Sequence, residues 1–558
     1  MTLLEFVAPT VDFARLAPFL IVIGAACVGV LVEAFVGRSW RHEIQSGLAI
    51  LALLAAMVVL ATQWGTTADA NFGLADPVAA VAGSPTGFPT GSVMVDRWTQ
   101  VFWLMLLAFG LIGLLLFAER SVYGGRTAFT SAAAAIPGSK AEAEATAARL
   151  EHAEVFPLAM FSLSGMLLFV AAEDLLMMFV ALEILSFPLY VLSGLARHRR
   201  LASQEAALKY FLLGAAASGM FLFGVGLLYA YSGSFDLSTL AFTVAGEGQS
   251  RSLLVAGLCL TAVGLLFKIG AVPFHSWAPD TYQGAPTPVT GFMAVTTKIA
   301  SLAAMMRLFI GALGGALWTW RPLFITIAII TMVVGAVIGM VQSDVKRLLA
   351  YSSIAHAGFI LVGVAGALTF VRYVGADQGS VTGVETAGLG SVGSIAFYMV
   401  AYGFATLACF ACITLVQSQG REATALSSWA GLGRTHPWFG AVMLISLLSL
   451  AGIPLTAGFV GKLTVFTAAW RGGLWWLALV AVLLSVAACY IYFRLVKVLF
   501  LDSPDPASTV EVKTPGPATV VVLVLAVIGT LGLGLVPGPL TNVLEQVSTF
   551  LTQIQLPA

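Results

Sequence analysis

Apolar residues form long continuous runs along most of the chain, and polar residues are concentrated in the segments between them. A helix that spans a bilayer needs about 20 mostly apolar residues. A membrane β-barrel would instead show strands of about ten residues with alternating polarity, which these runs do not have. The pattern therefore predicts an all-α polytopic membrane protein. It gives about 14 transmembrane helices, at 15–36, 46–64, 97–118, 155–171, 173–196, 205–231, 252–280, 288–313, 321–342, 347–368, 390–417, 436–468, 471–499 and 517–537.

Two of these helices contain helix breakers at membrane depth. The run FKIGAVPFHSWAPDTYQGAP holds Pro273, and the run SLAGIPLTAGFVGKL holds Pro454. Proline removes a backbone donor and clashes with the preceding turn, so both helices are expected to break. Irregular backbone inside a membrane is tolerated where it is buried in protein or lines a wet cavity. The breaks therefore indicate functional polar regions.

The two breaks lie five helices apart, an odd number that reverses the direction of the second copy. This spacing predicts two inverted five-helix repeats, each with a broken helix and with a functional site near the midplane. The predicted organisation has five segments: a three-helix segment at 1–118, a cytoplasmic insert at 119–154, repeats at 155–313 and 321–499, and a C-terminal helix and tail at 517–558.

Composition and charge support a membrane location. Hydrophobic residues make up 59% of the chain and charged residues 10%, whereas about a quarter of the residues are charged in soluble domains. The net charge of zero gives no general attraction to nucleic acid. All five cysteines fall in apolar runs, and the pair Cys409 and Cys412 has no second pair or flanking histidine, so packing roles are expected.

The distribution of lysine and arginine predicts the orientation. Loops after the odd-numbered helices hold sixteen of these residues, against six on the opposite side. Positive residues are enriched in cytoplasmic loops, so both termini are expected on the outer face of a bacterial plasma membrane. The run RHRR at 197–200 would then face the cytoplasm, as would the Ala/Glu-rich segment of 119–154, a helix or a disordered insert. Residues 65–96 would form an external loop, and no cleavable signal peptide is expected.

Five basic residues remain inside the predicted spans, and Glu183 is the carboxylate deep inside one. Each such charge costs about 2.5–3.5 kcal/mol at the helix centre and is a functional candidate. A desolvated lysine holds its proton less tightly and can exchange it near neutral pH. A surplus of buried lysines is therefore typical of a proton relay. The five residues are Lys209, Lys268, Lys298, Arg307 and Lys462.

Structural explanations compete with the relay at several positions. Glu183 and Lys209 could form one ion pair between helices, Lys209 could reach the interface, and Arg307 is better explained by snorkelling to the outer surface. Lys268 and His275 lie seven residues apart, which would place them on one face of an intact helix as two stations of a path. His275 could also be a packed core residue.

Four runs of sequence resemble a known protein family, and the resemblance covers most of residues 155–500. They are ALEILSFPLYVLSGLARHRRLASQEAALKYF, FKIGAVPFHSWAPDTYQGAPTPVTGFMAVTTK, DVKRLLAYSSIAHAGF and AGIPLTAGFVGKLTVF. Together they resemble the antiporter-like membrane subunits of respiratory complex I, the bacterial proton-pumping NADH–quinone oxidoreductase. The marked positions of that family fall on Glu183, Lys209, Lys268, His275, Lys298 and Lys462. His356, in AYSSIAHAGF, is a further candidate, as a linker between the two repeats.

The resemblance implies that this chain and the other subunits have different roles. The partners would be the other membrane subunits of the oxidoreductase, and FMN, iron–sulfur clusters, NADH and quinone would bind to other subunits. No cofactor, metal or redox centre is expected in this chain. Glu183 and Lys209 would respond to the redox event, Lys268, His275 and Lys298 would carry protons to the centre, and Lys462 would pass them outward. Two alternatives are a subunit of a monovalent cation/proton antiporter and a passive assembly scaffold.

Overall fold

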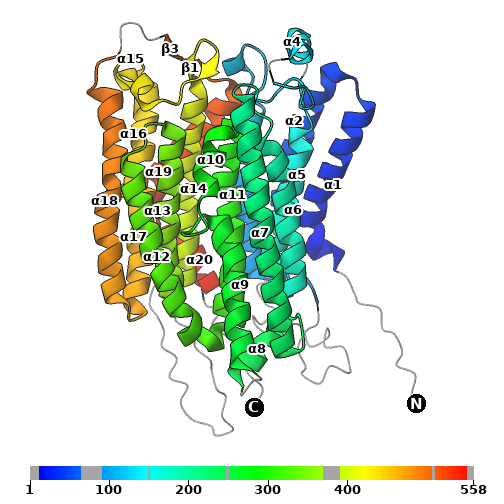
Figure 1. Cartoon of the computed structure of the whole chain (residues 1–558), viewed down its shortest axis with the longest axis vertical. Coiled ribbons are helices and arrows are strands. Elements are labelled where there is room, and N and C mark those ends of the chain that lie inside the picture. Colours follow the sequence, from blue (N-terminus) through cyan, green and yellow to red (C-terminus); the bar gives the residue numbers. More distant parts are fainter. Residues whose placement is uncertain are drawn as a thin grey trace.

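A computed structural model describes residues 12–64, 91–137, 139–148, 151–246, 250–367, 390–504 and 509–548. Its long helices stand side by side in one elongated bundle (Figure 1). In the described part of the chain, 12 helices are long and apolar enough to cross a membrane, and two shorter apolar helices accompany them. The prediction of an all-α polytopic membrane protein is confirmed. The count of 14 spans and the inverted repeats stay predictions.

The first and third spans follow the predicted positions closely, whereas the second, predicted at 46–64, begins earlier, at Arg38. The three spans are α1 (Phe13–Phe35), α2 (Arg38–Gln63) and α3 (Arg97–Phe117). The α1–α2 pair lies at one side of the bundle in Figure 1. Asp12 and Asp96 cap α1 and α3 by accepting hydrogen bonds from backbone N–H groups of the first turn.

The next group contains the first broken helix. It comprises α5 (Val155–Ala171), α6 (Leu175–Ser193), α7 (Arg200–Ser232), α9 (Arg251–Ile269), α10 (Trp277–Gly284) and α11 (Thr287–Met306), which continues as a π-helical turn, Arg307–Ala312. The predicted span at 252–280 is thus two helices with an irregular segment between them. The helix ends before Pro273, because Gly270 takes a left-handed conformation (φ 75°) that closes α9.

The second group contains the other break. It comprises α12 (Leu317–Met340), α13 (Val345–Ala365), α14 (Ser391–Leu415), α16 (Pro437–Ala451), α17 (Ala457–Arg471) and α18 (Trp475–Phe500). Between α16 and α17, Gly452 (φ 82°) and Leu455 (φ 72°) are both left-handed, on either side of Pro454. Both helix breaks expected from the prolines are therefore present.

Several small elements lie outside the predicted spans. A three-stranded antiparallel sheet with the order β2-β1-β3 forms at one end of the bundle, and α4 lies in the predicted insert at 119–154. Most of the predicted external loop, residues 65–90, lies outside the described residues. The small elements are η2 (Ser121–Tyr123), α4 (Lys140–Ala147), α8 (Leu237–Ala245), η4 (Gly314–Ala316), β1 (Val416–Ser418), β2 (Arg421–Glu422), η5 (Leu426–Trp429), α15 (Leu432–Thr435), β3 (Val510–Val512), α19 (Pro517–Leu535) and α20 (Gly538–Ser548).

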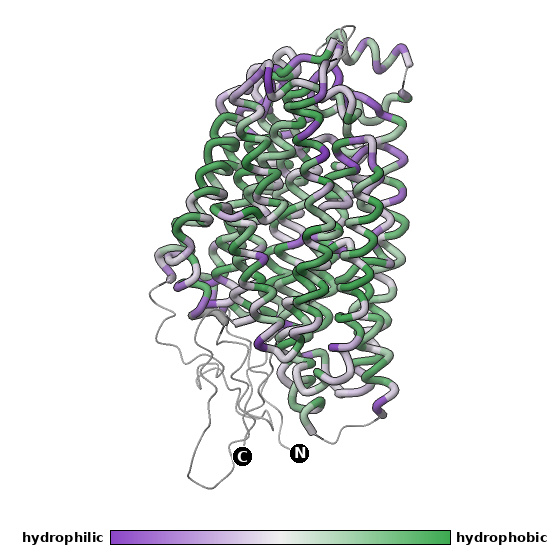
Figure 2. Tube along the Cα trace, turned by 90° about the vertical axis from the view of Figure 1, so that its left-hand side faces the viewer, coloured by the Kyte–Doolittle hydropathy of each residue, from purple (hydrophilic) through white to green (hydrophobic). Residues whose placement is uncertain are grey.

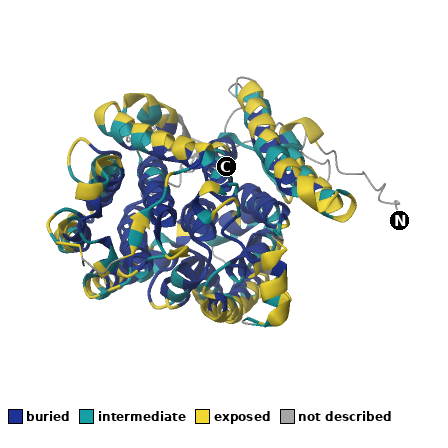
Figure 3. Cartoon of the chain, turned by 90° about the horizontal axis from the view of Figure 1, so that it is seen from above, coloured by how far each residue is buried: buried dark blue, intermediate teal, exposed yellow. Residues whose placement is uncertain are grey.

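Burial and hydropathy divide the bundle into a core and a lipid-facing rim. Hydrophobic residues cover the long body, and hydrophilic residues gather mainly toward its ends (Figure 2). Seen along the bundle, the buried residues lie in the middle and the exposed ones on the outside (Figure 3). The helices α11 and α13 are wholly buried in their most apolar stretch, and α14 is nearly so. Lys298 on α11 and His356 on α13 therefore lie deep inside protein.

Candidate functional site

Four of the predicted residues are buried basic groups on the central or broken helices. The exposed fractions are 2% for Lys268, 3% for Lys298, 3% for His356 and 6% for Lys462. Basic side chains this deeply buried almost always have specific partners. The contacts of each side chain decide whether these residues could form a path for protons.

Lys268 is the penultimate residue of α9, directly before the first break. Its Nζ atom lies 3.5 Å from the hydroxyl of Tyr190 on α6, and 5.2 and 5.4 Å from the ring centroids of Tyr190 and Tyr210. Aromatic faces attract a cation in such positions. Glu183 lies two turns before Tyr190 on the same helix, α6. One buried oxygen of Glu183 has no hydrogen-bond partner among the described residues.

The structure pairs Lys209 with other carboxylates than Glu183. Its Nζ atom lies 2.7 Å from Glu205, one turn earlier on α7, and 2.9 Å from Asp280 on α10. The described side chains make no direct Glu183–Lys209 ion pair. The reason is the helix break, which brings Asp280 against α7. Asp280 also binds Arg347 at 2.7 Å and was given no role from the sequence.

His275 lies in the irregular segment between α9 and α10. Because α9 ends at Ile269, His275 does not share an intact helical face with Lys268. Its ring is half-buried, and its Nδ1 atom is buried without a hydrogen-bond partner in the described ranges. Like Lys209, His275 lies apart from the group formed by Lys298, His356 and Lys462.

Lys298 occupies the centre of the bundle on α11. Its Nζ atom donates a hydrogen bond of 2.6 Å to the backbone oxygen of Ser353 on α13 and lies 5.4 Å from the ring centroid of Tyr402 on α14. The hydroxyl of Tyr402 donates to the Ser353 hydroxyl at 2.9 Å. The hydroxyl of Tyr282 on α10 lies 3.5 Å from the same atom. These contacts join the predicted first repeat to the second.

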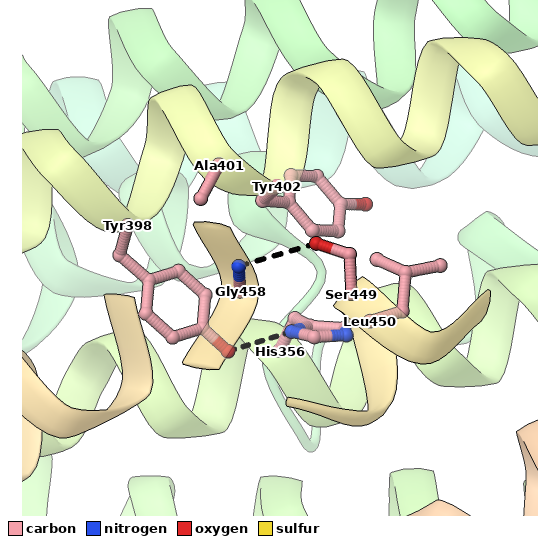
Figure 4. Close-up of a pocket in the computed structure, with 7 residues that line it drawn as sticks. All are labelled: His356, Tyr398, Ala401, Tyr402, Ser449, Leu450 and Gly458. Atoms are coloured by element: carbon pink, nitrogen blue, oxygen red, sulfur yellow. Dashed lines mark hydrogen bonds between the residues drawn. The ribbon is translucent and has the colours of Figure 1, made fainter. Parts of the chain in front are cut away.

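His356 lies on α13 between two tyrosine hydroxyls. Its Nδ1 atom is 2.6 Å from Tyr398 on α14, and its Nε2 atom is 2.9 Å from Tyr492 on α18. Figure 4 shows the Tyr398 contact beside a small cavity of about one water molecule in size. The cavity is lined by His356, Tyr398, Ala401, Tyr402, Ser449, Leu450 and Gly458.

Lys462 lies on α17, just after the second break. Its Nζ atom donates to the backbone oxygen of Ala451 at 2.8 Å and to the Ser485 hydroxyl at 2.9 Å. Ala451 is the last residue of α16, where carbonyl oxygens have no intrahelical partner. The break therefore supplies the acceptor that holds the lysine.

The tyrosines were missed at the sequence level. Tyr398 and Tyr402 lie one turn apart on α14, and Tyr282, Tyr398, Tyr402 and Tyr492 are all nearly fully buried. The sequence does contain a signal for them, because the tyrosine hydroxyls are polar groups that recur at helical spacing within apolar runs. Tyrosine also packs as an apolar residue, so that signal alone does not separate a relay group from a core residue.

Arg307 is buried, so the snorkelling explanation is wrong. Its guanidinium binds Glu173 at 2.7 Å and Asp96 at 3.0 Å, and it donates to the Thr99 hydroxyl at 2.9 Å. The explanation failed because both carboxylates are far from Arg307 in the sequence. Asp96 lies just before α3, and Glu173 lies just before α6. Burial raises the pKa of Glu173 to about 7, against the opposing effect of Arg307 and with a further contribution from Asp96.

Metal and cofactor ligands were also considered. In the described ranges, no group of three or more His, Cys, Asp or Glu side chains could hold a metal ion. The Cys409 and Cys412 thiols are both buried and free.

The fold and the site together define a multi-pass membrane protein with lysines and a histidine buried along its middle. The model of the family described as "NADH:quinone oxidoreductase/Mrp antiporter, TM" matches residues 172–374 and 380–488. The chain belongs to this family, and the resemblance seen in the four sequence runs is confirmed.

Bacterial proteins with similar sequences show which members of the family this chain resembles. The NADH-quinone oxidoreductase subunit N of Cutibacterium acnes is 48% identical over 98% of this chain and 97% of its own length. Subunit N of a Nocardioides strain is 47% identical, with 98% and 100% covered. A chain of respiratory complex I from Thermus thermophilus has a TM-score of 0.70 and 30% identity, with 95% and 99% covered.

A more distant structure shares only the fold. A chain of the Mrp complex from Dietzia has a TM-score of 0.77 at 18% identity, with 97% and 98% covered. Within the family, the chain therefore resembles subunit N in sequence, a chain of respiratory complex I in sequence and fold, and the Mrp protein in fold alone.

Proposed function

We propose that this chain is the proton-translocating membrane subunit of a bacterial NADH–quinone oxidoreductase. Electron transfer from NADH to quinone would occur in other subunits, which bind FMN and the iron–sulfur clusters, and this chain would move protons. The likeness to subunit N over nearly the full length of both chains favours this function over a stand-alone cation/proton antiporter. Neighbouring membrane subunits of the complex and the plasma membrane lipids would surround the chain.

The observation that carries the proposal is the set of buried basic groups with polar partners on α9, α11, α13 and α17. Lys298 contacts Ser353, which also binds Tyr402, and His356 follows Ser353 by three residues on the same face of α13. Lys462 lies beyond the second break. A proton can be held at each amine or imidazole, because each of them is a base.

We place the coupling to the redox event at Glu183 and Lys268. Glu183 has an unpartnered buried oxygen and lies on α6, the helix whose Tyr190 contacts Lys268. A movement of this carboxylate toward or away from the lysine would raise or lower its hold on a proton. Lys209 and Asp280, which form a half-exposed ion pair, would also contribute to this coupling, in place of the expected Glu183–Lys209 pair. His275 stays a proposed intake group, at the break and partly open to solvent.

The orientation and the repeats are also proposals. Arg197, Arg199 and Arg421 lie in the segments that pack around the small sheet at one end of the bundle. The positive-inside rule makes this end cytoplasmic and puts both termini outside. The similar order of helices around the two breaks supports the inverted repeats at 155–313 and 321–499.

The test uses the complex that contains this chain, purified and reconstituted in liposomes. We expect Lys268→Ala and Glu183→Ala to leave NADH–quinone electron transfer measurable but to lower the protons moved per NADH several-fold. Full pumping by both variants would contradict the proposal. Replacing Na⁺ with K⁺ in the buffer distinguishes the antiporter alternative, which expects transport to follow the cation. The scaffold alternative expects both variants to fail in assembly.

A further inference from the structure

The insert at 119–154 pairs with the loop that joins α6 to α7. Phe129 of the insert is fully buried and forms an antiparallel β-bridge with Ala196 of the loop. Two backbone hydrogen bonds of 2.9 Å flank this bridge, one donated by Thr130 and one donated by Arg197. The insert is therefore bound to the loop through its backbone as well as through side chains.

Two arginines next to this bridge bind the insert with their side chains. Arg197 donates to a backbone oxygen of the insert at 2.7 Å and to the Ser131 hydroxyl at 3.1 Å. Arg200 is 5% exposed, donates to two backbone oxygens of the insert at 2.8 and 2.9 Å, and pairs with Glu142 of α4 at 3.1 Å. Removing the partners of a buried guanidinium is costly, so these contacts hold the loop and the insert together.

The loop has a backbone conformation that depends on its surroundings. Arg199 is left-handed (φ 58°), although it is not a glycine. Such a conformation persists where the surrounding contacts impose it. The insert holds Arg197 and Arg200 on either side, and the Arg199 side chain donates to the Thr424 hydroxyl at 3.0 Å. The end of α6 is thus fixed by contacts from outside the helix.

The insert is itself attached to three other parts of the bundle. Glu119 is buried and accepts a hydrogen bond of 3.0 Å from the backbone N–H of Gly516, which caps α19. Arg120 pairs with Glu43 of α2 at 2.7 Å. The Tyr123 hydroxyl donates to a carboxylate of β2 at 2.8 Å. The insert therefore joins the loop to α2, β2 and α19, which belong to different parts of the chain.

A short series of contacts connects the loop to the candidate site. The Ser203 hydroxyl of α7 donates at 2.7 Å to the backbone oxygen of Ser193, the last residue of α6. Tyr190 lies three residues earlier, in the last turn of the same helix. Its hydroxyl is 3.5 Å from Nζ of Lys268. The loop held by the insert therefore lies within two turns of a side chain that contacts a buried lysine.

Pro188 divides α6 between Glu183 and Tyr190. A proline inside a helix removes one backbone hydrogen bond and is a common place for a bend. The part of α6 after Pro188 is next to the loop and the insert. The part before Pro188 carries Glu183 and makes none of the contacts with the insert described above. A bend at Pro188 would therefore move Glu183 relative to Tyr190.

We propose that the insert fixes the last turn of α6 and keeps Tyr190 against Lys268, with Arg197 and Arg200 as positioning residues. This inference rests on the proposed function, in which Lys268 exchanges a proton. With the end of α6 held in place, a movement of Glu183 changes its position relative to a lysine whose tyrosine partner stays where it is. Without the insert contacts, Tyr190 would shift together with Glu183.

The experiment removes the side-chain contacts of the loop in the reconstituted complex. In Arg197→Ala with Arg200→Ala, we expect normal amounts of assembled complex and measurable electron transfer. The protons moved per NADH should fall about threefold, because a small misplacement of a reacting group has a large effect on its rate. Cleavage of the insert by a glutamate-specific protease should become faster. Arg126→Ala, in the same insert but in none of these contacts, is the control and should behave as the unmodified complex does.

A milder variant covers the case in which the double substitution prevents assembly. Glu142→Gln removes the charge that pairs with Arg200 and leaves the backbone contacts of the arginine in place. We expect it to lower the protons moved per NADH by a smaller amount and to assemble normally. A normal ratio in whichever of the two variants assembles, together with faster cleavage of the insert, would overturn the inference, because the insert would then only stabilise the fold.

The route through Tyr190 has its own test. Tyr190→Phe removes the hydroxyl that contacts Lys268 and should also lower the ratio of protons to NADH. Adding Tyr190→Phe to the insert variant should cause no further loss, whereas additive losses would mean that the insert acts at another place. If Lys268→Ala itself pumps normally, the proposed function fails, and not this inference alone.

Discussion

Lys298 on α11 donates a hydrogen bond of 2.6 Å to the backbone oxygen of Ser353 on α13, so a lysine of the predicted first repeat is held by the second. Both helices are buried over their whole apolar stretch. The Ser353 hydroxyl also accepts a hydrogen bond from the hydroxyl of Tyr402 on α14. Lys298 therefore belongs to a polar cluster that the two halves of the chain share.

The buried triad at Arg307 makes a stability prediction. Arg307→Ala leaves Asp96 and Glu173 buried next to each other without their cation, so we expect a loss of about 3–5 kcal/mol. Thermal denaturation of the detergent-purified complex measures it. Arg15→Ala, which breaks the exposed pair with Asp12, is the control and should cost at most about 1 kcal/mol. Equal small effects would show that the triad does not stabilise the fold.

The same triad predicts a pH dependence through Glu173. Its pKa in the folded chain is raised to about 7 from the ordinary 4.5. The folded state therefore binds a proton that the unfolded state has lost, and its contribution to stability is present below pH 4.5 and is lost as the pH rises through 7. We expect the melting temperature to fall between pH 5.5 and 8 in the unmodified complex. In Glu173→Gln, which cannot ionise, the fall should be smaller, and an identical fall would refute the role of Glu173.

Gly458 is predicted to be essential for the second helix break. A Cβ atom at this position would lie 1.8 Å from the backbone oxygen of Ser449, far inside contact distance. We expect Gly458→Ala to separate α16 from α17 and to reduce the amount of assembled complex strongly. Gly226→Ala, where a Cβ atom would meet nothing within 4 Å, should assemble normally. Immunoblots of native gels compare the two, and normal assembly of Gly458→Ala would contradict the observed geometry.

The partners of Lys209 can be tested by double-mutant cycles. Lys209 and Asp280 should show a coupling of about 0.2–1 kcal/mol, because their pair is half-exposed. Lys209 and Glu183 should show nearly none. Alanine variants, single and double, are compared by thermal denaturation in detergent. Coupling of Lys209 to Glu183 in place of Asp280 would restore the pairing that the sequence suggested.

The fold class and the two breaks could be predicted from the sequence because both depend on local rules. Apolar length sets the spans, and Pro273 and Pro454 mark the interruptions. The exact ends depended on Gly270 and Gly452, whose left-handed conformation stops each helix earlier than proline would. The burial of Lys268, Lys298 and Lys462 was also predictable, since each lies well inside an apolar run.

The pairings could not be predicted, because they depend on which helices become neighbours. Asp280 approaches Lys209 only after the chain turns at the break, and Arg307 meets Asp96 across more than two hundred residues. The hydroxyls around His356 come from α14 and α18, which are separated in the sequence by the broken helix. A hydrophobicity pattern contains no information on these contacts.

The central claim is that the buried lysines bind and release protons during turnover. The most direct test is the number of protons moved per NADH oxidised by liposomes that contain the complex with Lys298→Ala. Lys497→Ala, at an exposed position on α18, is the control. The account predicts at least a threefold lower ratio for Lys298→Ala, with electron transfer still measurable and the control unchanged. A normal ratio in Lys298→Ala would contradict it.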